Sequence, residues 1–317
     1  METIEGPPAP SAADVEAIYT ATRNWGRWGD DDERGTLNLL TDERRAAAGA
    51  LVRSGRTVSL GRNLPVVPSP ETPSPAHHHM IAAGDARDAN GIPGYEASRD
   101  YVGTDVHGMG ITHVDALCHM FVRGEMYGGR SADLVKSTGA LANTIMAGAD
   151  GLAGRGVLLD LPRAFGVEHL PGNTAVGVAG LERAERELGV RVEEGDLLVI
   201  GTGRDVRRAA AGRLDPFQDG LAGLHAECLP WLHERGVAVL GSDGISDPTP
   251  GLGIPDWPFP IHQVGIVGLG LHLIDNLALD DLSAACADAG RFEFLLTVAP
   301  LRIVGGTGCP VNPIAVL

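Results

Sequence analysis

The chain has 317 residues, 44% of them hydrophobic, and its 25 Lys and Arg against 41 Asp and Glu give a net charge of −16. This length suffices for a substantial buried core, and so acidic a chain is repelled by nucleic acid and by anionic membranes, which we exclude as partners. The four cysteines are widely spaced, no apolar run nears the roughly 20 residues of a membrane helix, and the acidic first residues lack a signal-peptide pattern, so we expect a cytoplasmic protein.

The first half of the chain predicts short elements separated by loops. In chain order these are a helix at 14–22, a loop at 24–36, a helix at 41–53 with Thr41 as its N-cap, a strand at 58–60 and a long loop at 66–96. We expect an N-terminal extension with a short helix over residues 1–23. The remainder, 24–317, shows no linker and is expected to form a single domain.

The second half alternates strands and helices in the manner of an α/β protein. Short apolar runs bounded by Gly or Pro predict buried strands at 156–160, 196–202, 237–241 and 292–298. Amphipathic or apolar segments predict helices at 178–188, 224–235 and 262–271. The fold class we expect is therefore α/β.

Three histidines cluster around Asp115 in the sequence, at His107, His113 and His119. Residues two apart in a strand face the same way, so His113 and Asp115 would present an imidazole and a carboxylate to one cation. Zn²⁺ and Mn²⁺ both accept such mixed ligands. His119 follows the expected strand end and could serve there as a ligand or as an acid/base. The alternative is two solvent-facing histidines and one in the core.

Four further residues are weaker candidates for a substrate pocket. Trp25 and Trp28 could form the wall of an apolar pocket, although packing alone explains them equally well. His79 ends a run of three histidines and either faces a substrate or lies exposed in a polar loop. His225 opens the helix expected at 224–235 and either lies near the pocket or compensates the helix dipole.

The stretch from Thr112 to His119 resembles the signature of the cyclase family of metal-dependent hydrolases, whose pattern is His-x-Gly-Thr-His-x-Asp-x-x-x-His. That family includes bacterial kynurenine formamidase and isatin hydrolase. Segments at 24–41, 195–203, 237–243 and 305–315 are also similar to it. The resemblance implies a swivelling β/β/α domain, in which helices flank a mixed sheet.

The resemblance also implies roles for individual residues. It assigns metal ligation to His113, Asp115 and His262, and acid/base catalysis to His119. Asp275 falls where the family usually has a glutamate ligand, and its shorter side chain must reach further.

One position departs from the family pattern. Where the family has its first histidine this chain has Met109, and a thioether is a poor ligand for Zn²⁺ or Mn²⁺. If a strand extends back through this position, Met109 shares a face with His113 and points into the pocket. His107 could replace the missing ligand if the chain bulges. We therefore expect one ion rather than two, with a metal-free protein as the alternative.

The activity implied by the resemblance is hydrolysis of a small molecule by metal-activated water. The bond would be a non-peptide C–N bond in an amide, formamide or cyclic amide, with a lactone as a further option. The alternative is a non-hydrolytic cyclase or dehydratase of a secondary-metabolite pathway, able to work without metal. Because the family commonly assembles as homodimers or homotetramers, we also expect a homo-oligomer.

Overall fold

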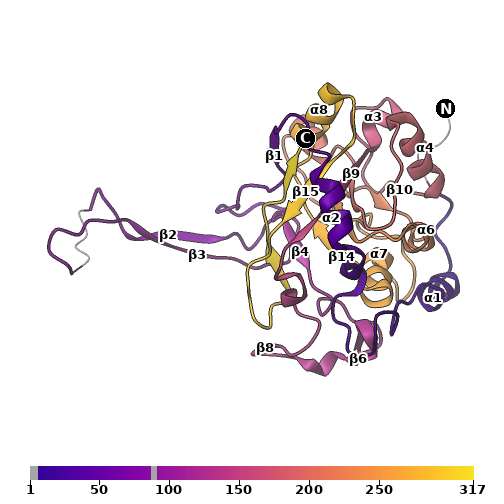
Figure 1. The fold of residues 1–317 in the computed structure, drawn as a ribbon, viewed down its shortest axis with the longest axis horizontal. Coiled ribbons are helices and arrows are strands. Elements are labelled where there is room, and N and C mark those ends of the chain that lie inside the picture. The colour runs from indigo at the N-terminus through magenta and orange to yellow at the C-terminus, as the bar shows by residue number, and fades with distance from the viewer. Residues whose placement is uncertain (1–5, 87–90) are drawn as a thin grey trace.

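The computed structural model describes residues 6–86 and 91–317. Residues 1–5, within the expected N-terminal extension, and 87–90, within the expected long loop, lie outside the described residues. A mixed sheet of nine strands runs through the molecule with helices on both faces (Figure 1). The expected fold class, α/β with a mixed sheet flanked by helices, is confirmed.

The strand order of the large sheet is β1-β17-β15-β9-β11-β13-β14-β4-β16. In chain order these strands are β1 (Thr57–Ser59), β4 (His113–Asp115), β9 (Leu152–Asp160), β11 (Leu197–Gly201), β13 (Val239–Ser242), β14 (His272–Asp275), β15 (Glu293–Val298), β16 (Gly308–Pro310) and β17 (Ile314–Val316). The four central strands β9, β11, β13 and β14 are parallel, and all other pairs are antiparallel. Parallel strands buried on both faces read as continuous apolar runs, which is why the sequence reveals β9, β11 and β13.

The helices are α1 (Ala12–Ala21), α2 (Asp42–Gly49), α3 (Leu161–Phe165), α4 (Val178–Leu188), α5 (Arg204–Ala211), α6 (Cys228–Arg235), α7 (Pro260–His262), a π-helical segment (Gln263–Leu269) and α8 (Asp280–Ala289). Short 3-10 turns lie at Gly35–Leu39, Tyr127–Gly129, Ala132–Leu134 and Ile145–Gly148. Within residues 6–86 and 91–317, no helix combines the length and apolar composition that a membrane crossing requires.

The core has two layers, one on each face of the sheet. Strand alternation sends Leu198 and Ile200 of β11 to one layer, which α1, α4 and α6 cover. It sends Leu197 and Val199 to the other layer, which α2 and α8 cover. This packing holds the strand ends in place, and the polar side chains described below project from them.

Eight short strands form separate two-stranded ribbons. They are β2 (His77–Ala82) with β3 (Arg99–Gly103), β5 (Glu125–Met126) with β6 (Arg130–Ser131), β7 (Val135–Lys136) with β8 (Gly139–Ala140), and β10 (Ala175–Val176) with β12 (Gly223–Leu224). The first ribbon projects far from the body (Figure 1). The expected loop at 66–96 is thus wrong in part, because strand β2 lies within it and pairs with β3.

Local sequence signals place most elements correctly. Helix α4 occupies its expected range, and the Thr41 side chain accepts the Arg44 N–H to cap α2. The helix expected at 224–235 begins only at residue 228, because its first two residues belong to or adjoin β12. Pro230 does not kink this helix, because it lies in the first turn, where no helical N–H is needed.

Two expectations near the histidine motif are corrected. The segment at 262–271 is not a regular helix, since one short α-helical turn passes into the π-helix. The strand expected to extend back to position 109 covers only His113–Asp115, and residues 106–111 bend away from it. Alternation therefore says nothing about where the Met109 side chain points.

Candidate metal centre

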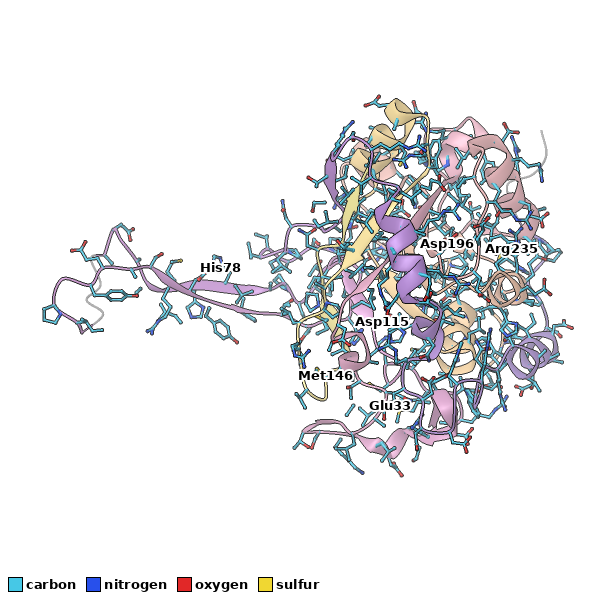
Figure 2. All side chains as sticks on the ribbon, viewed as in Figure 1. Glu33, His78, Asp115, Met146, Asp196 and Arg235 are labelled. Atoms are coloured by element: carbon cyan, nitrogen blue, oxygen red, sulfur yellow. The ribbon has the colours of Figure 1, made fainter. Side chains whose placement is uncertain are left out.

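Strands β4 and β14 bring three of the predicted ligands together. His113 and Asp115 lie two apart on β4 and share a face. In the antiparallel pairing with β14, Asp275 stands directly opposite His113 and joins them on that face. This register explains how the shorter aspartate side chain reaches the site. All three residues are buried in the body of the molecule, where Figure 2 labels Asp115.

His262 reaches the same place from α7, and Asp247 fixes its ring. The Asp247 carboxylate accepts the backbone N–H groups of Ile261 and His262 and lies 2.8 Å from His262 Nδ1. The other nitrogen, Nε2, is thereby directed at the cluster, 3.3 Å from Asp275 Oδ2 and 3.7 Å from Asp115 Oδ2. A carboxylate behind a histidine in this way is typical of metal-binding sites.

His107 enters the cluster from the bend before β4. Its Nδ1 lies 2.8 Å from Asp115 Oδ1, and its Nε2 lies 3.0 Å from the Thr307 hydroxyl. His113 Nε2 lies 3.4 Å from the same Asp115 oxygen, while its Nδ1 contacts the Ile111 carbonyl at 2.8 Å. The bend thus brings His107 to the same carboxylate as His113, although the two histidines lie six residues apart.

These side chains form two groups of three that share Asp115. One group is His107, His113 and Asp115, and the other is Asp115, His262 and Asp275. In a tetrahedral zinc site with bonds near 2.1 Å, ligand atoms lie about 3.4 Å apart. The separations of 2.8–3.7 Å given above fit that spacing.

Several buried polar atoms of the cluster make no well-aligned hydrogen bond, although Asp115 Oδ1 and His107 Nδ1 lie close to each other. These atoms are both carboxylate oxygens of Asp115, one of Asp275 and Nδ1 of His107. A buried, unsatisfied carboxylate is strongly unfavourable, and a native structure normally resolves it with a partner. A divalent cation is a partner that fits this donor set, so the residues fit a metal on chemical as well as geometric grounds.

Without a metal, the buried carboxylates govern the ionisation of their neighbours. Burial acts to lower the pKa of His113, but the charge of Asp115, aided by Asp275, raises it to about 9. Burial likewise opposes protonation of His262, yet Asp275 and Asp247 raise its pKa well above the usual value. Each cation that binds must therefore displace protons from these imidazoles.

His119 stands beside the cluster. It lies in the turn after β4, and its ring stacks on that of His107 with centroids 3.7 Å apart and planes 9° apart. Its centroid is 6.5 Å from the His262 ring. Burial lowers the pKa of His119 to about 4. The ring makes no hydrogen bond within residues 6–86 and 91–317, so its nitrogens remain available to a substrate.

The other predicted residues belong to neither group of three. The Met109 backbone carbonyl accepts a hydrogen bond from Arg204. Trp25 packs against the core and donates its indole N–H to Val267 in the π-helix. Trp28 stacks with Arg27. His79 lies on the projecting ribbon, 5.2 Å from the ring of Tyr101.

His225 is buried in the turn between β12 and α6 and belongs to neither group of three. Its Nδ1 accepts the backbone N–H of Glu227 at 3.2 Å. Its β-carbon lies close to Gly6 of the N-terminal segment. These contacts are those of a residue that packs the N-terminal segment against α6.

Sequence reasoning missed three residues that hold the cluster in place. They are Asp247 behind His262, Thr307 behind His107, and Asn276, whose amide donates to the carbonyls of Gly108 and Ile111. Asn276 directly follows Asp275, which was a weak local signal. Thr307 lies in the segment 305–315 that resembles the family, but nothing in the sequence links it to His107, 200 residues away. Asp247 had no signal.

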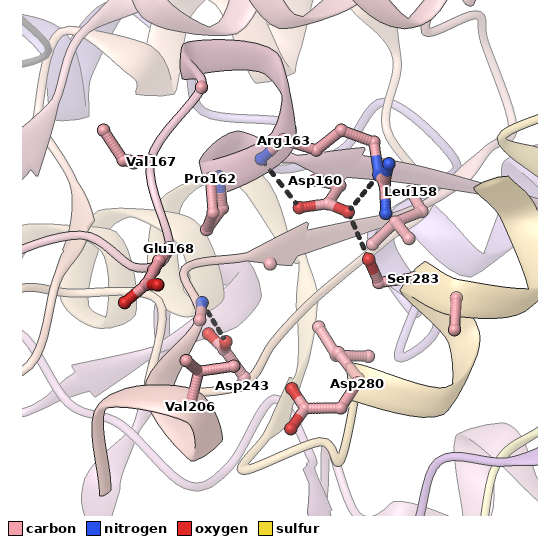
Figure 3. A pocket seen from close by; sticks show the side chains of 15 residues that line it. Leu158, Asp160, Pro162, Arg163, Val167, Glu168, Val206, Asp243, Asp280 and Ser283 are labelled. Atoms are coloured by element: carbon pink, nitrogen blue, oxygen red, sulfur yellow. Dashed lines mark hydrogen bonds and ion pairs between the residues drawn. The ribbon is translucent and has the colours of Figure 1, made fainter. Parts of the chain in front are cut away.

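A cavity of about 480 Å³ lies at the carboxyl ends of β9, β11 and β13 (Figure 3). Sheets of this kind often bind ligands there. Its two buried carboxylates already have partners, however, and the other two, Glu168 and Asp280, are exposed. Asp160 pairs with Arg163 and Ser283, and Asp243 accepts three backbone N–H groups at the start of α5. The unsatisfied atoms favour the histidine cluster as the reactive site.

The sequence and fold of this chain are similar to those of known proteins. Residues 57–247 match the family model described as "Putative cyclase". A crystal structure of a novel cyclase superposes with a TM-score of 0.83 at 30% identity, covering 94% of this chain and 99% of that one.

Two named proteins are also similar. Kynurenine formamidase from Bacillus cereus is 30% identical over 110 residues, which are 34% of this chain and 46% of that protein. The match thus spans about half of the relative's length. Isatin hydrolase A from Labrenzia aggregata, solved with benzyl benzoate, has a TM-score of 0.58 at 23% identity over 84% of this chain and 94% of its own, a likeness of fold.

Proposed function

Because the chain belongs to the cyclase family, we propose that it is a metal-dependent hydrolase cleaving a non-peptide C–N bond of a small molecule. The bond lies in an amide, formamide or cyclic amide, with a lactone as a further option. The observation that carries the proposal is Asp115, whose two buried oxygens make no well-aligned hydrogen bond and face separate sets of histidine and carboxylate groups. The similarity to a kynurenine formamidase supports the class of bond.

We propose further that the cluster would hold two divalent cations, Zn²⁺ or Mn²⁺, one at each group of three residues. The sequence-based expectation of a single ion rested on Met109. His107 supplies an imidazole to the first group instead, and this supports a second ion. The same contact removes the reason for preferring a metal-free cyclase or dehydratase.

In this proposal each side chain has a defined task. A cation held by the cluster would polarise a substrate carbonyl and lower the pKa of a water molecule. Asp247 holds the His262 ring so that Nε2 faces the cluster. His119 touches His107 and has both ring nitrogens free, so it accepts a proton from the attacking water and returns it to the leaving nitrogen.

The test is metal analysis combined with hydrolysis. Protein purified without chelator should carry close to two equivalents of Zn or Mn, and it should hydrolyse a panel of aryl formamides and cyclic amides. His113→Ala and His262→Ala should lose metal and activity together. His169→Ala removes a histidine outside the cluster and should change neither. Metal-free wild-type protein without hydrolytic activity would contradict the proposal and favour the non-hydrolytic alternative.

A further inference from the structure

Residues 61–76, which connect β1 to β2, form a segment that we call the strap. The side chains of Arg62 and Glu71 are turned into the body and are only 8% and 11% exposed. Three apolar residues of the strap are instead 41–70% exposed, namely Leu64, Val66 and Val67. Burial of charged groups is unfavourable unless they are paired. Polar contacts with the body, rather than an apolar core, therefore hold these two side chains in place.

Hydrogen bonds fix the strap at its start and at its end. The Arg62 N–H donates to the Thr112 hydroxyl at 2.9 Å, and the Arg62 guanidinium donates to the Asn276 carbonyl, also at 2.9 Å. Thr112 and Asn276 adjoin the proposed ligands on β4 and β14. The Ala76 N–H donates to the Pro65 carbonyl at 2.7 Å and closes the rest of the strap into a loop. This closed loop presents its carboxylate from a fixed place.

That carboxylate, on Glu71, pairs with the buried Arg204. Oε1 of Glu71 lies 2.8 Å from Arg204 Nη2, and the same nitrogen donates to the Met109 carbonyl in the bend before β4. Burial lowers the pKa of Arg204, the nearby Arg62 guanidinium lowers it further, and Glu71 raises it. In the part of the chain that the structure describes, Glu71 is the only carboxylate within ion-pair distance of Arg204. The contact between Arg204 and the bend therefore depends on the strap.

The strap also contacts the bend directly, at Gly110. A β-carbon built on Gly110 would lie 1.9 Å from the Thr72 hydroxyl oxygen, so any side chain there would displace Thr72. Glycine thus permits the two segments to approach this closely. Together with the Met109 carbonyl, this contact fixes the bend within three residues of His107.

We propose that Glu71 is a positioning residue for His107. It fixes Arg204, whose guanidinium holds the bend so that the imidazole faces Asp115. This inference rests on the proposed function, in which that imidazole is a metal ligand. Without the Glu71 carboxylate, the guanidinium is a buried charge with no ion-pair partner among the described residues, so it must draw in water or turn toward solvent. Either change releases the Met109 carbonyl.

Metal titration of the full chain by calorimetry tests this role. Glu71→Ala should weaken binding of one ion about 10-fold, the lower end of the loss when outer hydrogen-bond partners of ligands are removed, and leave the other ion unchanged. Glu71→Gln keeps an oxygen for Arg204 and should lose less. Glu185→Ala is the matched control, because the Glu185 side chain is 9% exposed and pairs with Arg235. It should lose stability without losing metal affinity.

The effect of Glu71 should also depend on His107. In a His107→Ala background, Glu71→Ala should cause no further loss of affinity for either ion, because the group that it positions is absent. Equal fold-losses with and without His107 would show that Glu71 acts only through the stability of the fold, and would overturn the proposal.

Nuclear magnetic resonance of metal-free protein tests the geometry without any ion. With isotope-labelled histidine, the His107 ring signals should shift in Glu71→Ala and, to a smaller extent, in Glu71→Gln. The His262 signals should not shift, since Asp247 holds that ring from another segment. The His107→Ala spectrum assigns the His107 signals. A wild-type chain that binds no metal would contradict the proposed function, and this readout would still decide the role of Glu71. His107 signals that match wild type in both variants would overturn it.

Discussion

The residue that decides the chemistry of the site is Asp115. Its carboxylate is fully buried, and its oxygens contact His107 and His113 on one side and His262 on the other. A buried carboxylate shared by two ligand groups can balance the charge of two cations while stabilising each. In the proposed function the neighbouring histidines therefore divide into proposed ligands, which face Asp115, and one residue beside them, His119.

His119 offers the clearest separation of catalysis from metal binding. His119→Ala should lower kcat by about 10²–10⁴-fold, the usual loss when a general acid/base is removed. Its metal content should match wild type, because His119 belongs to neither ligand group. Steady-state kinetics together with metal analysis checks this. Equal loss of metal and of turnover would make His119 a ligand instead.

Metal content can also show which of His107 and Met109 contributes to metal binding. His107→Ala should lose about half of the bound metal, because it removes one ligand of the first group. Met109→His should not raise metal content, since the bend already brings His107 to Asp115. Met109→Ala is the control and should behave like wild type. A gain of metal in Met109→His would restore the sequence-based view that position 109 holds an incomplete site.

Among the elements, the bend before β4 is the one whose shape matters most for the site. Arg204 donates a hydrogen bond to the Met109 carbonyl. Asn276 donates hydrogen bonds to the carbonyls of Gly108 and Ile111. Arg204 is itself bonded to the Asn276 side-chain oxygen at 2.6 Å. Because both residues are buried, they fix the bend that aims His107 at Asp115.

The hydrogen bonds from Asn276 to the bend before β4 predict that Asn276 positions His107. Asn276 has a φ of 58°, so Asn276→Gly removes the amide without straining the backbone. We expect metal affinity to fall about 10–100-fold, as when outer hydrogen-bond partners of ligands are removed. Metal titration followed by calorimetry measures it.

The control for that titration is Asn143→Gly. Asn143 is also buried with a positive φ, but its amide bonds the Tyr127 carbonyl. It should lose stability without losing metal affinity. Equal metal affinities in the two variants would contradict a specific role for Asn276.

At the scale of the whole molecule, the chain carries a net charge of −16. Most carboxylates that lie inside the body, wholly or in part, have partners, arginines among them. Asp196 is a buried carboxyl group that holds its proton to a higher pH than a free aspartate does. It precedes β11, is labelled in Figure 2, and accepts the Glu193 N–H at 2.7 Å, with Arg155 3.4 Å away. Burial nevertheless raises its pKa from 3.8 to about 6.

The raised pKa makes a prediction about stability and pH. Because the folded chain binds this proton more tightly than the unfolded chain, Asp196 favours folding most below pH 3.8, and that contribution is lost as the pH rises to about 6. The free energy of unfolding of wild type minus that of Asp196→Asn should fall across this window and stay level above it. Urea unfolding at a series of pH values measures the difference. A difference that rises with pH would show that Arg155 outweighs burial.

The elements that local patterns predicted well share a physical cause. The central strands are buried on both faces and so read as apolar runs, and α4 ends at Gly189, which adopts the left-handed conformation that stops a helix. The projecting ribbon of β2 and β3 escaped prediction because its strand residues are polar and apolar without strict alternation. The π-helix escaped because its composition is that of an ordinary buried helix.

For the site, the sequence by itself determined that His113 and Asp115 share a face, because that follows from the two-residue period of a strand. It also placed His119 within reach of them. Only the tertiary structure decided that His107 rather than Met109 faces Asp115, that Asp247 holds His262, and that Asp275 stands opposite His113. These contacts depend on strand pairing and loop closure between segments distant in the chain, and no local periodicity records which distant segment a strand will pair with.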